Sequence, residues 1–249
     1  MARNDHFSAF AATYASYRPT YPAALFAWLA DQAPATYGAW DCATGTGQAA
    51  LSLAEHFAHV FASDVGIGMI EHAVPHPRIS YHLAPAEEPP PSITDLDLIT
   101  VAQALHWFDR DTFFAACEQR LRPGGILAYW GYLLPSITPA VDAVVRHYHD
   151  IAVGPHWPPD RGPLLDGYAQ IAPPNMERLT APPFAMTATW TLDQLIGQLD
   201  SWSATHRARQ ATGNDPLAPI VPELRAAWAE APQRPITWPL PFHAFRKPR

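Results

Sequence analysis

The residues with the most evident chemistry lie close together near residue 41. A short apolar run ends in Asp41, and Gly45 and Gly47 follow it, each preceded by a threonine. Glycine allows the backbone to adopt positive φ and lets a ligand approach without meeting a Cβ atom. Residues 49–57 then have the spacing of an amphipathic helix, whose first N–H groups can bind an electron-rich ligand. The sequence therefore predicts a strand, a glycine turn and a helix that bind a nucleotide or nucleoside.

Two interpretations of this turn compete, beside a third in which it binds nothing. Residues 45–50 match the dinucleotide fingerprint G-x-G-x-x-G/A. Read from Asp41, the segment resembles the D/E-x-G-x-G-x-G loop of class I S-adenosylmethionine-dependent methyltransferases, with Ala43 in place of the first glycine. The resemblance implies that the loop binds the cofactor through Asp41, Ala43, Thr44, Gly45, Gly47 and Gln48.

The order of the later motifs favours the methyltransferase. Asp64 ends the strand predicted over 59–63 and can bind both hydroxyls of a ribose. A strand at 96–101 leads into Ala-Leu-His-Trp-Phe, and Leu-Arg-Pro-Gly-Gly precedes a strand at 126–130. This set resembles the methyltransferase family over residues 7–131, and more loosely to the C-terminus, with the trans-aconitate methyltransferase-like members as the nearest relatives. This ordered set of motifs is not expected in an NAD-binding oxidoreductase.

The resemblance implies further contacts to S-adenosylmethionine. The aromatic segment 7–17 resembles the family's lid helix, and Arg18 after it would pair with the carboxylate of the methionine moiety. Val65 and Met69 would lie against the adenine, and Glu87 near its amine. Ordinary packing or surface roles remain the alternatives for each of these side chains. The implied contacts outside the glycine loop are Tyr14, Arg18, Asp64, Val65, Met69, Ala86, Glu87, Gln103 and Ala104.

The implied fold class is α/β, a doubly wound, seven-stranded, mostly parallel sheet of the Rossmann-like kind, in one domain over residues 1–249. We expect lid helices within 1–31 and a helical or loop cap inserted after strand five, at 132–183. Patterning predicts a sixth strand at 184–190 and helices at 139–153, 191–211 and 220–230. The final segment, 236–246, is predicted to be an antiparallel strand near the sheet edge, because prolines interrupt it.

His106 and Trp107 follow strand four, where the methyl acceptor should lie. His106 could be a general base, an orienting donor or a structural residue, and Trp107 could form a wall of the acceptor pocket. A carboxylate or thiolate acceptor needs no base, whereas a hydroxyl or ammonium acceptor does. If the acceptor is an organic acid, as the nearest relatives suggest, a cap arginine should bind it. The available cations are Arg146, Arg161, Arg207 and Arg209.

Composition excludes several classes of partner. The net charge of −7 argues against nucleic acid and anionic membranes, and no apolar run is long enough to span a bilayer. The two cysteines do not make a disulfide framework, so we expect a cytoplasmic protein. The histidines at 147, 149 and 156 lack the arrangement of a metal site, and we expect none. A small-molecule acceptor is therefore favoured, and a non-catalytic cofactor-binding member of the fold remains the main alternative.

Overall fold

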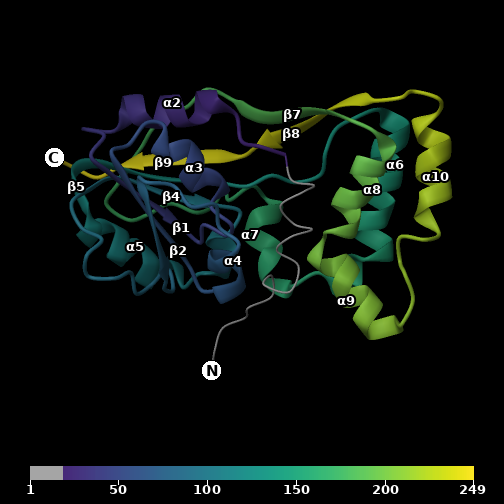
Figure 1. The fold of residues 1–249 in the computed structure, drawn as a ribbon, viewed down its shortest axis with the longest axis horizontal. Coiled ribbons are helices and arrows are strands. Elements are labelled where there is room, and N and C mark those ends of the chain that lie inside the picture. Colours follow the sequence, from purple (N-terminus) through teal and green to yellow (C-terminus); the bar gives the residue numbers. More distant parts are fainter. Residues whose placement is uncertain (1–18) are drawn as a thin grey trace.

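The computed structural model describes residues 19–249, and Figure 1 shows a sheet flanked by helices beside a second group of helices. The main sheet has seven strands in the order β3-β2-β1-β4-β5-β9-β6. Strands β1 to β5 are parallel, and β9 is antiparallel to both of its neighbours. This confirms the expected fold class. The strands are β1 (Gly38–Cys42), β2 (His59–Asp64), β3 (Ile79–Leu83), β4 (Leu96–Ala102), β5 (Leu121–Trp130), β6 (Glu177–Arg178) and β9 (Phe242–Arg246).

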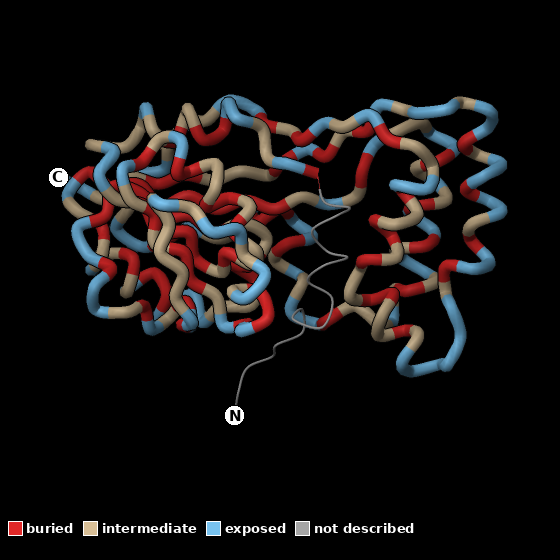
Figure 2. The backbone as a smooth tube through the Cα atoms, in the orientation of Figure 1, coloured by how far each residue is buried: buried red, intermediate tan, exposed pale blue. Residues whose placement is uncertain are grey.

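The strand order reverses between β1 and β4, and this reversal determines where ligands bind. In open α/β sheets a crevice forms at such a point, outside the carboxyl ends of the strands. Strands β1 and β4 are almost continuously buried, as their apolar sequences require when helices cover both faces. Buried residues accordingly fill the middle of the sheet layer in Figure 2. The helices of this layer are α2 (Ala23–Gln32), α3 (Gln48–Ala54), α4 (Ile67–Glu71) and α5 (Arg110–Arg120).

The segment predicted as one final strand is two strands, so this prediction was wrong in part. Strand β8 (Arg234–Leu240) pairs antiparallel with β7 (Phe184–Trp190) in a separate two-stranded sheet. Only β9 enters the main sheet, beside β5. The break falls at Pro241, which lacks the N–H that a continuing ladder needs. The strand predicted at 184–190 is confirmed, but it belongs to the smaller sheet.

The second group of helices combines α6, α8, α9 and α10, which stand side by side in Figure 1. Their bounds are α6 (Pro139–His147), α8 (Leu192–Asp200), α9 (Ser203–Thr212) and α10 (Ile220–Trp228). A π-helical turn, η3 (Tyr148–Ala152), continues α6, and α7 (Gly162–Leu165) lies between the two groups. The single helix predicted over 191–211 is wrong, because α8 ends at Asp200 and α9 begins at Ser203. The expected lid and cap boundaries at 31, 132 and 183 stay predictions.

Candidate active site

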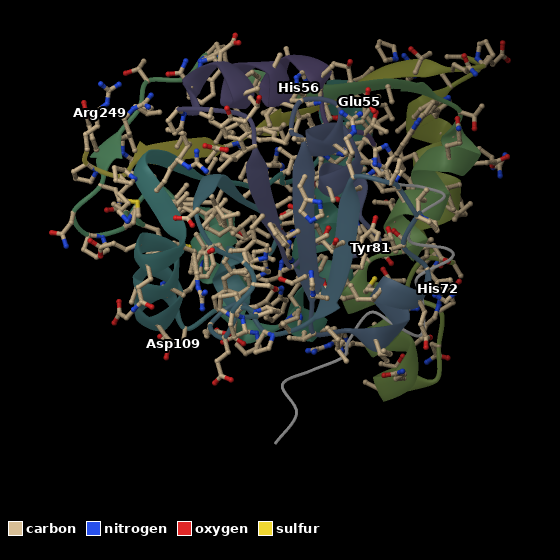
Figure 3. All side chains as sticks on the ribbon, turned by 60° about the vertical axis from the view of Figure 1, so that its left-hand side comes forward. Glu55, His56, His72, Tyr81, Asp109 and Arg249 are labelled. Carbon is tan, nitrogen blue, oxygen red and sulfur yellow. The ribbon has the colours of Figure 1, made fainter. Side chains whose placement is uncertain are left out.

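The glycine turn after β1 adopts backbone angles that favour glycine. Gly45 and Gly47 have φ values of 57° and 88°, and Ala43 has a φ of 55°. Ala43 therefore adopts the left-handed conformation that its family counterpart, a glycine, adopts more easily. At Gly47 an added Cβ would collide with the hydroxyl of Tyr81, which is labelled in Figure 3. The positive φ of Gly47 and its contact with Tyr81 therefore both favour glycine at this position.

Asp41 lies beneath this turn and joins it to the neighbouring strand. Its carboxylate is 1% exposed and accepts hydrogen bonds from the hydroxyls of Thr44 and Thr100, the latter at 2.9 Å. Burial raises the pKa of Asp41 to about 6, although these hydrogen bonds and one from the backbone of Ala50 act in the opposite direction. Asp41 therefore links β1, β4 and the start of α3, and holds the glycine turn in place.

Asp64, at the end of β2, lies directly beside the turn. Its two carboxylate oxygens accept the backbone N–H groups of Gly45 and Gly66, both at 2.8 Å. Each carboxylate oxygen has more than one lone pair, so these bonds leave capacity for a ribose hydroxyl. Asp64 thus organises the turn, and its contact with a ribose stays a prediction.

Three apolar side chains near Asp64 are exposed to solvent. Val65, Ile67 and Leu83 have exposed fractions of 49%, 50% and 56%. Leu83 pairs with Asp64 across β2 and β3, so the three surround the end of β2. Exposed apolar side chains gathered at the carboxyl ends of parallel strands indicate a ligand surface. Sequence reasoning found Val65 but missed Ile67 and Leu83, whose exposure has no local signal.

The other predicted adenine contacts occupy different environments. Met69 and Ala86 are 4% and 6% exposed, so packing accounts for both. The carboxylate of Glu87 accepts the backbone N–H of Asp109 at 2.8 Å and thereby joins the loops after β3 and β4. Tyr14 and Arg18 lie outside the described residues. Gln48 donates through its side chain to the carbonyl of Pro19 at 3.3 Å, so it contacts the segment that follows Arg18.

Gln103 follows β4 and lies at the border of the crevice. Its φ of 59° is unusual for a residue other than glycine, and such strain concentrates at functional sites. Its backbone N–H donates to the carbonyl of Trp130, and its side-chain amide to the carbonyl of Tyr132, both at 2.9 Å. Its side-chain oxygen is buried and has no partner among the described residues. The amide of Gln103 thus fixes the chain between the ends of β4 and β5, next to the crevice.

His106 lies on a single 3-10 turn, η2 (Leu105–Trp107), and is 7% exposed. Its Nδ1 atom lies 2.8 Å from the hydroxyl oxygen of Tyr168. Burial, and secondly the charge of Arg161, lower the pKa of His106 to about 3. The Trp107 ring lies 4.6 Å from the imidazole and is half-buried. His106 is therefore neutral at physiological pH.

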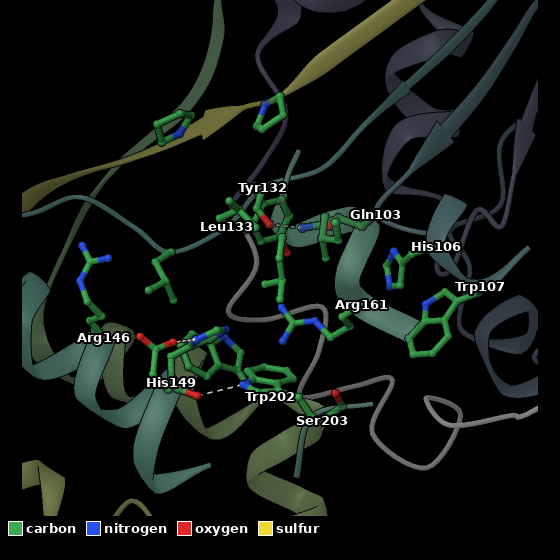
Figure 4. A pocket seen from close by; sticks show the side chains of 17 residues that line it. Gln103, His106, Trp107, Tyr132, Leu133, Arg146, His149, Arg161, Trp202 and Ser203 are labelled. Atoms are coloured by element: carbon green, nitrogen blue, oxygen red, sulfur yellow. Dashed lines mark hydrogen bonds and ion pairs between the residues drawn. The ribbon is translucent and has the colours of Figure 1, made fainter. Parts of the chain in front are cut away.

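A pocket of about 430 Å³ opens between η2 and the second group of helices (Figure 4). His106 and Trp107 face it from one side, next to Gln103, and their role at the methyl acceptor stays a prediction. The opposite side is aromatic and basic, and sequence reasoning missed most of it because it combines distant segments. The lining residues that Figure 4 labels are Gln103, His106, Trp107, Tyr132, Leu133, Arg146, His149, Arg161, Trp202 and Ser203.

Arg161 is the cation nearest the middle of this pocket in Figure 4. Its guanidinium lies 3.6 Å from the centre of the Trp157 ring, and burial lowers its pKa to about 10. Among the described residues no carboxylate forms an ion pair with it. Arg209, by contrast, pairs with Asp200 and Asp215. Of the four arginines proposed from the sequence, Arg161 and Arg146 line the pocket.

Two other classes of site have no support in residues 19–249. No group of three or more His, Cys, Asp or Glu side chains is arranged to hold a metal ion there. None of the helices in that range is both long enough and apolar enough to cross a membrane. The histidine at 149 instead contacts Asp150, with 2.6 Å between Nδ1 and Oδ1.

Comparison with known proteins identifies the family. Residues 40–129 match a family model described as a methyltransferase domain. A candidate methyltransferase of Dictyostelium discoideum is 32% identical over 224 residues, which cover 88% of this chain and 84% of the relative. The chain belongs to the class I S-adenosylmethionine-dependent methyltransferases.

Solved structures of methyltransferases share the fold. A candidate type II methyltransferase from Anaeromyxobacter dehalogenans is 43% identical, with a TM-score of 0.84 and coverage of 93% of this chain and 99% of that one. Phosphoethanolamine N-methyltransferase 2 of Haemonchus contortus, solved with S-adenosyl-L-methionine, is 15% identical with a TM-score of 0.53. That alignment covers 99% of this chain and 59% of the other, and it shows a common fold only.

Family membership makes S-adenosylmethionine the cofactor of this methyltransferase, and the residues described above fit it. Gly45 and Gly47 present no side chain to a ligand, and Asp64 has acceptor capacity for a ribose. The exposed apolar group at Val65, Ile67 and Leu83 suits a purine ring. Gln103, directly after β4, lines the adjoining pocket.

Proposed function

We propose that this methyltransferase methylates a small carboxylic acid, which binds in the pocket with its carboxylate on Arg161. The observation that carries the proposal is the half-buried guanidinium of Arg161, which has no carboxylate partner among the described residues. The resemblance to the trans-aconitate methyltransferase-like members supports the same acceptor class.

The surroundings of Arg161 suit an anionic ligand. The guanidinium of Arg161 lies over the face of the Trp157 ring, a contact that leaves its in-plane N–H groups for a ligand. Arginine binds carboxylates through two parallel hydrogen bonds, and such charge-assisted bonds are stronger than neutral ones. A charge removed from water is costly unless it is paired, and a bound carboxylate would provide that pair.

The other walls of the pocket suit the apolar body of such an acid. Trp107, Trp157 and Trp202 line it, and the rings of Trp157 and Trp202 are 5.5 Å apart. Their flat apolar faces can bury carbon atoms while Arg161 binds the charged end.

S-adenosylmethionine supplies an electrophilic methyl group, and an ionised carboxylate oxygen is a sufficient nucleophile without a general base. The protein then has to hold that oxygen in line with the methyl group and keep water away. His106 and Gln103 border the pocket on the side of the cofactor crevice, so this is the end at which the acceptor oxygen is expected.

The test is methyl transfer from radiolabelled S-adenosylmethionine to a panel of aromatic and aliphatic acids, each paired with its primary amide and its alcohol. We expect transfer to an acid and none to its neutral analogues. Arg161→Gln should lower kcat/KM for that acid by roughly 10- to 150-fold, which corresponds to about 1.5–3 kcal/mol for a hydrogen bond to a charged group.

Arg225→Gln is the matched control, because Arg225 lies on α10, is exposed and does not line the pocket. It should leave kcat/KM unchanged. Transfer to an amine or alcohol with equal rates in the Arg161→Gln variant would refute the acid acceptor. Binding of the cofactor without transfer to any acceptor would favour the non-catalytic alternative.

A further inference from the structure

Tyr168 is held in an unusual position behind His106. It follows α7 with a φ of 60°, directly after Gly167 with a φ of 66°. An L-residue in this left-handed region costs roughly 1–2 kcal/mol, so the surrounding packing must maintain it. The Tyr168 ring is fully buried, meets Tyr129 edge to face at 5.9 Å and lies 6.2 Å from the His106 ring. The strained backbone thus places one phenol against one imidazole.

The hydrogen bond between these two side chains contains a single proton, and its direction decides the tautomer of His106. The hydroxyl oxygen of Tyr168 lies 2.8 Å from Nδ1 of His106. Among the described residues, the Tyr168 hydroxyl forms no other hydrogen bond. Tyr168 is fully buried, and a buried hydroxyl hydrogen needs an acceptor, so the phenol donates its proton to Nδ1. A neutral imidazole that accepts at Nδ1 carries its proton on Nε2.

Nε2 is the ring atom left for a ligand. No residue in the described part of the chain forms a hydrogen bond with it, and His106 lines the acceptor pocket. The titratable groups that act on the imidazole are Tyr168, from the loop after α7, and Arg161, from the 3-10 turn Pro159–Arg161. An imidazole that took a proton from the acceptor would become a buried cation near Arg161, which is an unfavourable arrangement.

We propose that Tyr168 is a positioning residue that holds His106 in the tautomer protonated on Nε2, so that His106 donates a hydrogen bond to the acceptor oxygen and does not remove a proton from it. The inference rests on the proposed function for the chemical identity of that oxygen. The tautomer itself does not depend on any acceptor.

The first experiment therefore needs no substrate. Proton–nitrogen correlation spectra of the protein with ¹⁵N-labelled histidine distinguish a protonated ring nitrogen from an unprotonated one, and the His106 signals are those lost in His106→Gln. We expect a protonated Nε2 and an unprotonated Nδ1. In Tyr168→Phe, which removes only the hydroxyl, the His106 signals should shift toward a mixture of tautomers. A protonated Nδ1 in the wild-type protein overturns the proposal, whatever the acceptor proves to be.

The second experiment separates donor from base. A glutamine side chain can place an N–H near the position of Nε2 but cannot act as a base, whereas alanine can do neither. His106→Gln should retain kcat within roughly tenfold of wild type, and His106→Ala should lose more, with cofactor affinity unchanged in both. The donor role would be refuted if both variants lost kcat equally, by roughly a hundredfold or more, and the wild-type rate fell as pH drops through the imidazole pKa. That result would establish His106 as a general base.

Tyr168→Phe should raise KM for the acceptor more than it lowers kcat, because a misplaced donor weakens acceptor binding without removing any reacting group. A structural role alone would instead lower the thermal midpoint with KM unchanged, and that result also contradicts the proposal.

Discussion

Replacing Ala43 with glycine should stabilise this methyltransferase. Ala43 is the only position in the turn where a side chain is held at positive φ, 55°, while Gly45 and Gly47 have no Cβ to strain. The left-handed region costs an L-residue roughly 1–2 kcal/mol, and glycine avoids that cost. Glycine in turn loses more backbone entropy on folding, by roughly 0.5–1 kcal/mol. The net expectation is a gain of about 0.5–1 kcal/mol.

For a domain of this size, a gain of about 1 kcal/mol raises the thermal midpoint by roughly 2–4 °C. Calorimetric melting of the protein without cofactor measures that change directly, and urea unfolding gives the free energy. The variant keeps the backbone of the turn, so titration calorimetry should show no loss of affinity for S-adenosylmethionine.

The matched control is Ala115→Gly, an exposed position inside α5. There the same chemical change should destabilise by about 1 kcal/mol, because the helical backbone suits alanine. If Ala43→Gly loses as much stability as Ala115→Gly, residue 43 carries no conformational strain and the reasoning is refuted.

Two further predictions concern the acids of the site. The folded-state pKa of Asp41 is raised from 3.8 to about 6, so the folded protein keeps a proton that the unfolded chain has released, and stability falls as pH rises through this window. The stability of Asp41→Asn relative to wild type should therefore increase by about 3 kcal/mol from acidic to neutral pH, measured by urea unfolding at each pH. The titration of His106 contributes equally to both proteins and cancels in this comparison. A stability difference that stays constant with pH would contradict the raised pKa of Asp41. Asp64→Ala removes the acceptor for the N–H groups of Gly45 and Gly66 and should weaken cofactor binding by roughly tenfold or more, with Asp64→Asn intermediate. Equal affinity in a folded Asp64→Ala protein places this acid outside the site.

Local pattern in the sequence was sufficient to predict the five parallel strands of the main sheet and its glycine turn. Strands β1 and β4 are mostly apolar and almost continuously buried, and parallel strands buried on both faces require that composition. The final segment was harder to predict, because prolines disrupt a ladder without specifying which strand each half will pair with. Its division at Pro241 depends on β5 and β7, which lie far away in the chain.

The sequence alone determined the family, the cofactor turn and the presence of His106 and Trp107 after strand four, because each depends on residues within a few positions of one another. Only the tertiary structure decided what these residues face. Arg161 and Arg209 look alike in the sequence, but folding places Arg209 between Asp200 and Asp215 and Arg161 on Trp157 in the pocket. Likewise, 62 residues separate the two partners of the bond between His106 and Tyr168. Periodicity and backbone preference act over a few residues, whereas the pairing of a buried polar group depends on which distant segment packs against it.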